Sequence, residues 1–268
     1  MHIVERNFYR LLRAGAFATS EHIEALSAWK WRRLYQLSVM HDVAPLLYQG
    51  LERCSDQFFV QVPPKLRQEW SEATVSDADD ENVLLAGNHL TNPVLNRRLQ
   101  TMLDSEDSTI EVRTTLLHMV GIARFVMNAG VPVKRVTDLG LYLRHVGGRI
   151  DARQLCDWLR LLGLEPMAEL AAAMLVQLLG FEAEELPFVA SYDRQRMERR
   201  LEELLRQRNS HAEEWYFSQG KNIFVHTSNS QAMLWHVRRS ARYFSYYPME
   251  VTTNFFTAFA HSLSHIEE

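Results

Sequence analysis

The sequence lacks the features that mark secreted or strongly charged proteins. It has only two cysteines, Cys54 and Cys156, in 268 residues, which is too few for the disulfide framework of a secreted protein. Its formal net charge is −4, which excludes a global positive field able to gather nucleic acid or an anionic membrane. We therefore expect a cytoplasmic protein with reduced thiols.

Long apolar runs are also absent. The most apolar stretch, "MAELAAAMLVQLLGF", is interrupted by Glu169 and Gln177 and is too short to span a bilayer. The first residues, "MHIVERNFYRLLRAG", contain several charged side chains and no apolar core of the secretory type. We expect a soluble chain that has no membrane partner and is long enough to bury a substantial core.

Helical periodicity is what the sequence has in quantity. A long polar helix is expected from Pro64 to about Leu103, with a break or kink at Pro93. Only "FFVQV" (58–62) and "NIFVHT" (222–227) resemble strands, and strands do not alternate with helices as they would around a parallel sheet. The sequence predicts an all-α fold, a multi-helix array of helical hairpins with little or no sheet.

The clearest local signals for a helix begin at Asp151. This residue has the side chain and the position of a helix N-cap, with Gln154 three residues later. The apolar residues that follow at i, i+3, i+4 and i+7 are Leu155, Trp158, Leu159 and Leu162. The pattern places Trp158 in the core and ends the helix at Gly163. Cys156 is expected to be buried and unreactive.

Two groups of residues invite a metal hypothesis. In "SDADDEN" (76–82), Asp77 and Asp79 are spaced like carboxylates that hold magnesium, but they lie in a polar helical stretch rather than after a strand. His261 and His265 share a helical face, yet no nearby carboxylate apart from the terminal Glu267 and Glu268 offers a third ligand at a suitable spacing. We predict no metal, no cofactor and no catalytic residue.

One segment concentrates basic and aromatic residues, "WHVRRSARYFSYYPME" (235–250). A ligand-binding hypothesis assigns phosphate contacts and base stacking to a cluster between Arg238 and Tyr247. Its candidate residues are Arg238, Arg239, Arg242 and Tyr243. The alternative is a helix end where arginines complement the dipole and aromatic rings pack inward, and the net acidic charge favours this alternative.

The order of several segments resembles a known family. "NFYRLLRAGAF", "WRRLYQLSVMHDVAPLLYQGL", "VPPKLRQEW" and "ENVLLAGNHLTNPVLNRRL" are similar to the N-terminal helical part of a large bacterial family of uncharacterised nucleotidyltransferases. "LLHMVGIARFVMNAGVPVKRVTDLGLYLRHVGGRIDARQLCDWLRLLGL" is similar to the later helical region of that family. His118, Lys134 or Arg135, and Asp138 match its landmarks. The resemblance covers most of the range from residue 7 to residue 186 and fades afterwards.

The resemblance implies that a catalytic core is missing. The family carries, between its two helical regions, a Lys-Gly turn and an Asp-x-Asp pair on a strand that would hold magnesium and nucleotide phosphates. Here the two regions meet at a short polar stretch, Asp104–Ser108, which we name the seam. No catalytic residue carries over. His118, Arg135 and Asp138 are expected to be structural, as are Asp151 and Trp158, with Asp138 pairing with a neighbouring arginine at the start of its helix.

These patterns lead to one functional hypothesis and two alternatives. The first is a non-catalytic helical binding or assembly module whose partner is another protein or a second copy of the chain. One alternative is a nucleotidyltransferase-type enzyme that completes its site with another chain. The other is a nucleotide or nucleic-acid binder that uses the Arg238–Tyr247 cluster. We expect a single helical domain over 1–268, with possible lobes 1–104 and 109–268, and a tail (245–268) that folds back over the gap.

Overall fold

The computed structural model of the chain describes residues 2–74, 87–128, 133–189, 193–199, 201–202, 247, 249 and 252–253. All regular structure in these residues is helical, with no strand among them, which confirms the all-α prediction. The stretch 58–62 forms a turn followed by irregular chain, while 222–227 lies outside the described residues. None of the described helices is both long and apolar enough to cross a membrane.

The chain folds into two compact units, each built from separate stretches of sequence. Unit 1 comprises Met1–Leu84, Pro132–Gly147 and Met174–Glu185. Unit 2 comprises Leu85–Val131, Gly148–Ala173 and Leu186–Glu268. The units therefore do not follow the expected lobes 1–104 and 109–268, and the seam lies inside unit 2.

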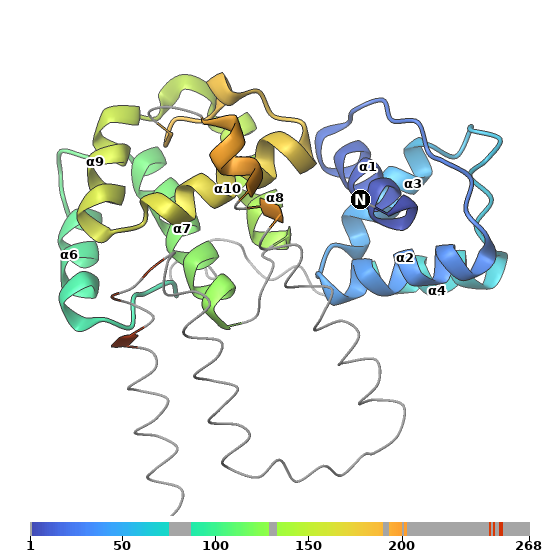
Figure 1. The fold of residues 1–268 in the computed structure, drawn as a ribbon, viewed down its shortest axis with the longest axis horizontal. Helices are drawn as coiled ribbons and strands as arrows, with labels where there is room; N and C mark the ends of the chain where they lie inside the picture. The colour runs from blue at the N-terminus through green and yellow to red at the C-terminus, as the bar shows by residue number, and fades with distance from the viewer. Residues whose placement is uncertain are drawn as a thin grey trace, which may run out of the picture. The chain divides into compact units, whose positions relative to one another are not determined.

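Unit 1 contains most of the N-terminal helices (Figure 1). Its elements are α1 (Ile3–Phe17), α2 (Ala28–Met40), α3 (Ala44–Arg53), α4 (Pro64–Glu72), α8 (Val133–Val146), the last residues of α10 (Glu165–Leu179) and η2 (Ala183–Glu185). Pro45 and Pro64 stand in the first turns of α3 and α4, where a missing N–H costs nothing. Val4, Phe8 and Leu11 form part of the buried face of α1.

Two glycines allow α1 and α3 to cross with their backbones in contact (Figure 1). A Cβ added to Gly15 would stand 1.8 Å from the carbonyl oxygen of Leu46, and one added to Gly50 would stand 2.0 Å from that of Leu11. Both distances are far inside van der Waals contact, so only glycine fits at either position. This crossing fixes the centre of unit 1.

The three stretches of unit 1 meet around Arg144 of α8. Its guanidinium carbon lies 5.3 Å from the ring centroid of Phe17 and 4.5 Å from that of Phe181, within the range of cation–π attraction. Arg144 also pairs with Glu185 at 3.4 Å. The two rings meet edge to face, with 5.3 Å between their centroids. Arg144 thus ties α1 and α8 to the segment after α10.

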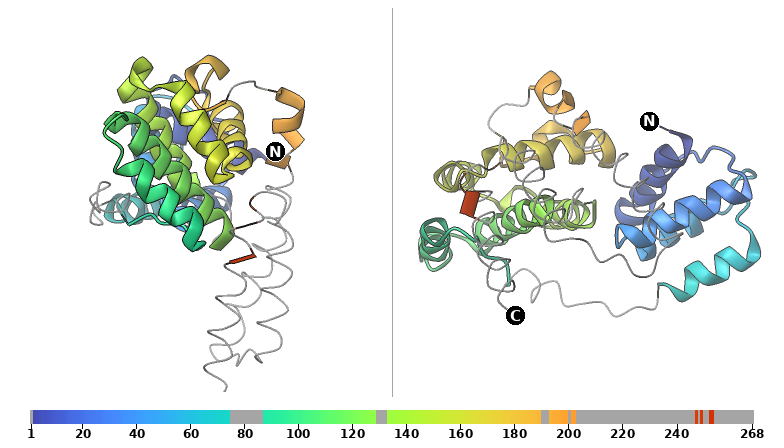
Figure 2. Two further views of the ribbon diagram at one scale, coloured as in Figure 1. Left: turned by 90° about the vertical axis from the view of Figure 1, so that its left-hand side faces the viewer. Right: turned by 60° about the horizontal axis from the view of Figure 1, so that its bottom comes forward.

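Unit 2 contains α6 (Pro93–Leu103), α7 (Ile110–Asn128), α9 (Ala152–Leu162) and the first residues of α10, and α9 packs against both α6 and α7 (Figure 2). The Asn92 side chain accepts from the N–H groups of Val94 and Leu95 at 3.0 and 3.1 Å. This cap makes Pro93 the first residue of α6, so the predicted break at Pro93 is confirmed. The long helix expected before it is wrong, because α4 ends at Glu72 and residues 87–92 are not helical.

The predicted limits of α9 are also confirmed. Asp151 accepts from the N–H of Gln154 at 3.0 Å, and Gly163 ends the helix at φ 69°. Leu155, Leu159 and Leu162 form the buried stripe.

The core position predicted for Trp158 is wrong, because this side chain is half-buried and lines an open groove. Successive helical residues are about 100° apart, so Trp158 lies at the edge of a stripe that Leu159 occupies more centrally. Cys156, expected to be buried, is also half-buried. Burial still raises the pKa of its thiol, which keeps it in the less reactive protonated form.

The seam is a closed turn between α6 and α7. Arg113 of α7 donates to the carbonyl of Leu103 at 3.2 Å and to that of Ser108 at 2.7 Å. The buried Ser108 hydroxyl donates to the carbonyl of Ser105 at 3.0 Å. One side chain therefore binds the backbone at both ends of the seam, which joins α6 to α7 as a short turn.

Two of the described tail residues bond to other segments of unit 2, beside which the short red pieces of the tail lie (Figure 2, right). Tyr247 is buried, and its hydroxyl donates to the carbonyl of Leu162 at 2.8 Å, one of the carbonyls that a helix C-terminus leaves without an intrahelical partner. Thr253 accepts from the side-chain amide of Asn92 at 3.0 Å. The tail folds back at these points, and its covering of a gap left by a lost core stays a prediction.

Candidate binding surface

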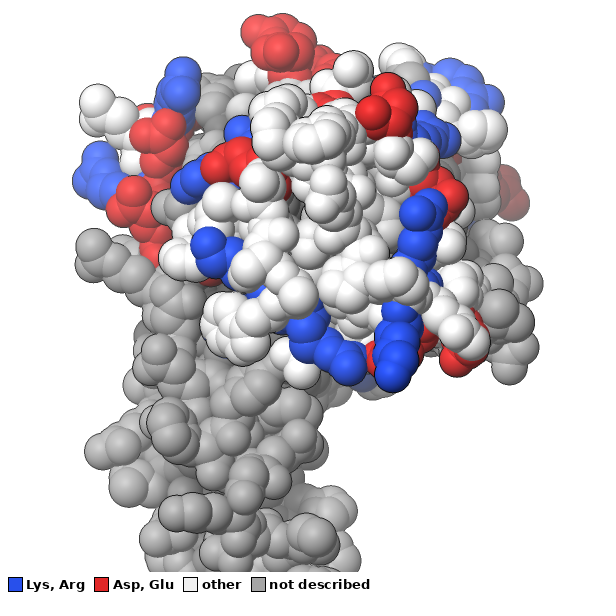
Figure 3. Space-filling view, turned by 90° about the vertical axis from the view of Figure 1, so that its right-hand side faces the viewer, with Lys and Arg blue, Asp and Glu red and all other residues white. Residues whose placement is uncertain are grey.

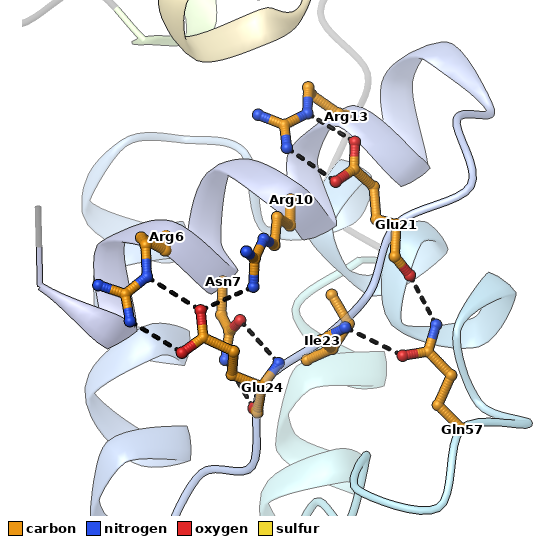
Figure 4. Close-up of polar contacts among 8 residues, drawn as sticks. All are labelled: Arg6, Asn7, Arg10, Arg13, Glu21, Ile23, Glu24 and Gln57. Carbon is orange, nitrogen blue, oxygen red and sulfur yellow. Dashed lines mark hydrogen bonds and ion pairs between the residues drawn. The ribbon is translucent and has the colours of Figure 1, made fainter.

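Two connecting segments of unit 1 lie side by side: 18–27, between α1 and α2, and 54–63, between α3 and α4. Gln57 joins them (Figure 4). Its side-chain oxygen accepts from the N–H of Ile23 at 3.0 Å, and its nitrogen donates to the carbonyl of Glu21 at 2.6 Å. One side chain thus uses both ends of its amide to hold the two segments together.

Three arginines of α1 bind the first of these segments. Arg6, Arg10 and Arg13 follow one another at helical spacing and so project from one face. Arg6 and Arg10 each bind Glu24 at 2.8 Å, and Arg13 binds Glu21 through two N–H groups at 2.6 and 2.7 Å. Figure 4 shows the three guanidinium groups directed at the two carboxylates. These charge-assisted bonds clamp the segment 18–27 to α1.

A buried amide completes the clamp. Asn7 is fully buried; it donates to the carbonyl of Glu24 at 2.8 Å and accepts from the N–H of Glu24 at 3.1 Å. The hydrogen bond from Arg6, aided by the charges of Arg6 and Arg10 and opposed by burial, lowers the pKa of Glu24 to about 2. Glu24 is therefore ionised throughout the pH range in which most proteins are folded.

This lowered pKa predicts an acid-dependent loss of stability. The pKa of Glu24 in the folded chain, about 2, lies below its usual value of 4.5. The contribution of ionised Glu24 to folding stability is therefore complete above pH 4.5 and is lost as the pH falls toward 2. We expect Glu24→Gln to melt at a lower temperature at neutral pH and to lose less stability than the native chain over that window. Circular dichroism melting curves at a series of pH values measure both effects.

Glu184→Gln is the matched control for the Glu24 variant. It removes a carboxylate of the same unit from an exposed position in η2 and should leave the pH dependence close to that of the native chain. A Glu24→Gln protein with the native pH profile would show that the clamp contributes nothing to stability.

The segment 54–63 and the start of α2 present aromatic side chains to solvent. Phe58 and Phe59, directly after Gln57, are 78 % and 51 % exposed, and their rings meet edge to face with centroids 5.4 Å apart. Trp29, at the start of α2, is 67 % exposed, and the Arg33 guanidinium lies 5.9 Å from its ring centroid. Large exposed aromatics on an ordered loop are typical of interaction sites.

Figure 3 shows the side of the molecule on which these connecting segments of unit 1 lie. Side chains without charge occupy the centre of this face, and lysine, arginine, aspartate and glutamate side chains lie around them. Such an arrangement, with an uncharged centre and a charged rim, is the usual anatomy of a protein interface. We name the exposed pair Phe58 and Phe59 the diphenylalanine tip.

The landmark residues of the family resemblance fall in different units. His118 is buried on α7 in unit 2, whereas Arg135 and Asp138 lie on α8 in unit 1. Asp138 binds Lys134 through both carboxylate oxygens at 2.9 Å, so its partner is a lysine rather than the predicted arginine. Burial raises the pKa of the Asp138 carboxyl. The positive charges of Lys134 and Arg135 oppose this shift, and the negative charge of Asp42 adds to it.

The other candidate site residues do not form one cluster among the described residues. Asp151 caps α9 and lines the same groove as Trp158. Tyr247 is buried, so its ring cannot stack on a nucleotide base. The other residues considered lie outside the described part of the chain: Asp77, Asp79, Arg238, Arg239, Arg242, Tyr243, His261 and His265. Within the described ranges, no three His, Cys, Asp or Glu side chains are grouped to hold a metal ion.

The diphenylalanine tip was not predicted from the sequence, which suggested only a short extended piece at 58–62. Neighbouring residues of a strand point to opposite faces, so two adjacent phenylalanines cannot both enter one core. Their position between a polar segment and Pro63–Pro64 was the available signal of an exposed turn. Comparisons of the chain with protein-family models, curated proteins and solved structures found no match.

Proposed function

We propose that the chain is a non-catalytic helical module for binding or assembly, and that its partner docks on the diphenylalanine tip. The observation that carries the proposal is the high exposure of Phe58 and Phe59 on a loop that Gln57 holds in place. The partner is another protein or a second copy of this chain.

The energetics of the tip suit this role. Burial of an exposed phenylalanine contributes about 1.5–3 kcal/mol, so two adjacent rings supply much of the energy of a specific contact. The loop is already fixed through Ile23 and Glu21, and a preorganised loop loses little entropy on binding. Aromatic anchors near the centre of an interface commonly dominate its affinity.

We propose further that this module is related to the helical regions of the nucleotidyltransferase family. The closed seam supports it, because Arg113 binds the backbone on both sides of the point where the family carries its catalytic core.

Sedimentation equilibrium of the full chain at micromolar concentration tests association with a second copy, and Phe58→Ser/Phe59→Ser should abolish any dimer. For a different partner, we expect a photo-crosslinking phenylalanine analogue at position 58, expressed in the native host, to form one discrete adduct. The same analogue at Val39, which is 51 % exposed in the same unit, is the control. A monomer that also yields no adduct specific to position 58 would refute the proposal.

The enzyme and nucleotide-binding alternatives make a different prediction. A nucleoside triphosphate with magnesium at a hundredfold excess over its Kd would stabilise a binder by about 2.7 kcal/mol. We expect no melting shift. A shift lost in Asp77→Asn/Asp79→Asn would favour the enzyme, and a shift lost in Arg238→Ala/Arg242→Ala would favour the nucleotide binder.

A further inference from the structure

Unit 2 exposes large apolar side chains where two helix ends meet. Val94, in the first turn of α6, is 58 % exposed, and Leu161, in the last turn of α9, is 56 % exposed. Arg98, one turn after Val94 on the same helical face, donates to the carbonyl of Leu161 at 3.5 Å. The two exposed residues therefore belong to adjoining turns.

The tail adds a third apolar side chain to this place. Met249 is 55 % exposed and lies between two anchored residues, Tyr247, bound to Leu162 of α9, and Thr253, bound to Asn92 before α6. In the right-hand view of Figure 2 the short piece of tail lies between α9 and α6. Segments distant in sequence thus build one surface.

An open groove of about 340 Å³ continues this surface along α9. Its lining residues are Asp151, Arg153, Gln154, Asp157, Trp158 and Leu161. From the first to the last of these the helix rises about 15 Å, the length of roughly three helical turns. Trp158 and Leu161 supply the apolar part of the lining. We name the groove together with Val94 and Met249 the α6–α9 surface.

Among the described residues, ion pairs join some of the charged side chains at this surface and leave three arginines beside it without one. Arg160 pairs with Asp157 at 3.0 Å and with Glu165 at 3.4 Å, and the Asp151 carboxylate is used as a helix cap. The basic side chains that form no ion pair with any described carboxylate are Arg97, Arg98 and Arg153. The surface therefore combines an apolar row with a positive flank.

We propose that the α6–α9 surface binds an amphipathic helix of a partner protein that carries acidic residues beside its apolar stripe. Apolar side chains at i, i+3, i+4 and i+7 of such a helix pack on the apolar end of the groove together with Val94 and Met249, and its carboxylates meet Arg97 and Arg153. A second copy of this chain would add the same unpaired arginines to the contact. This surface belongs to unit 2 and does not depend on the diphenylalanine tip of unit 1.

Three fluorescent peptides of equal length test the proposal with the full chain. One has leucines at i, i+3, i+4 and i+7 with flanking glutamates, the second has lysines in place of the glutamates, and the third is a scrambled version of the first. Fluorescence anisotropy should show binding of the first peptide alone. Added salt should weaken it, because exposed charges are screened beyond about 10 Å at 0.1 M ionic strength.

Variants assign the peptide to this surface. Leu161→Asp and Arg153→Glu should each lower the affinity for the glutamate peptide about tenfold or more. Arg153→Glu should also raise the affinity for the lysine peptide. The control variant Phe58→Asp changes a matched exposed apolar residue of unit 1, and it should bind the glutamate peptide as the native chain does. Equal binding of the scrambled peptide, indifference to Leu161→Asp, or loss of binding in Phe58→Asp would each overturn the proposal. Circular dichroism establishes that each variant is folded.

Discussion

Gly50→Ala is expected to unfold unit 1 or to destabilise it by about 4 kcal/mol or more. The added Cβ would stand 2.0 Å from the carbonyl oxygen of Leu11 and 3.0 Å from the backbone nitrogen of Gly15. Overpacking in a core usually costs about 1–3 kcal/mol, because side chains move aside. Here the opposing atoms are backbone of α1, so relief requires the two helices to separate.

Chemical denaturation followed by circular dichroism measures this effect. Gly148→Ala is the matched control, because a Cβ added at Gly148 meets nothing within 4 Å and its unfolding curve should stay close to that of the native chain. A Gly50→Ala protein as stable as the native one would mean that α1 and α3 do not cross in contact.

Trp70→Ala is expected to cost about 3–5 kcal/mol, the usual range for a buried large aromatic residue. Trp70 is fully buried, and its indole N–H donates to the carbonyl of Ala44 at 3.0 Å. Its ring also meets Tyr35 edge to face, with 5.4 Å between centroids. The side chain therefore joins α4 to both α2 and α3, and its loss leaves a cavity and an unpaired carbonyl.

Trp158→Ala provides the comparison within the same chain. Trp158 is half-buried at the edge of an open groove, so its truncation should cost no more than about 2 kcal/mol. Urea denaturation of both variants, at equal protein concentration, gives the two losses. Equal losses would place Trp158 in the core, as its spacing in the sequence predicts.

The parts of the fold that could be predicted are those with local causes. Pro93 begins α6 because proline lacks an N–H and fits the first turn, and Asp151 begins α9 because its side chain binds the N–H three residues later. Gly163 ends that helix because it adopts a positive φ at little cost. Each of these signals is contained in a few neighbouring residues.

The parts that could not be predicted depend on contacts between distant residues. Gly15 and Gly50 each look like unfavourable residues inside a helix, and only the crossing of α1 with α3 explains them. Gln57 resembles any polar loop residue until Ile23 and Glu21 lie beside it. The candidate binding surfaces arise from such contacts, while the resemblance to nucleotidyltransferases stays a prediction.

The discontinuity of unit 1 has a consequence for its synthesis. A ribosome releases α1–α4 first, but α8 follows only after a long stretch of unit 2, and Phe181 and Glu185 emerge later still. Until then, Phe17 lacks two of its neighbours, Arg144 and Phe181. Apolar surface of the nascent N-terminal helices therefore stays exposed during this part of synthesis. Chaperones commonly bind chains in such a state. Any fragment that stops before Glu185 lacks part of unit 1.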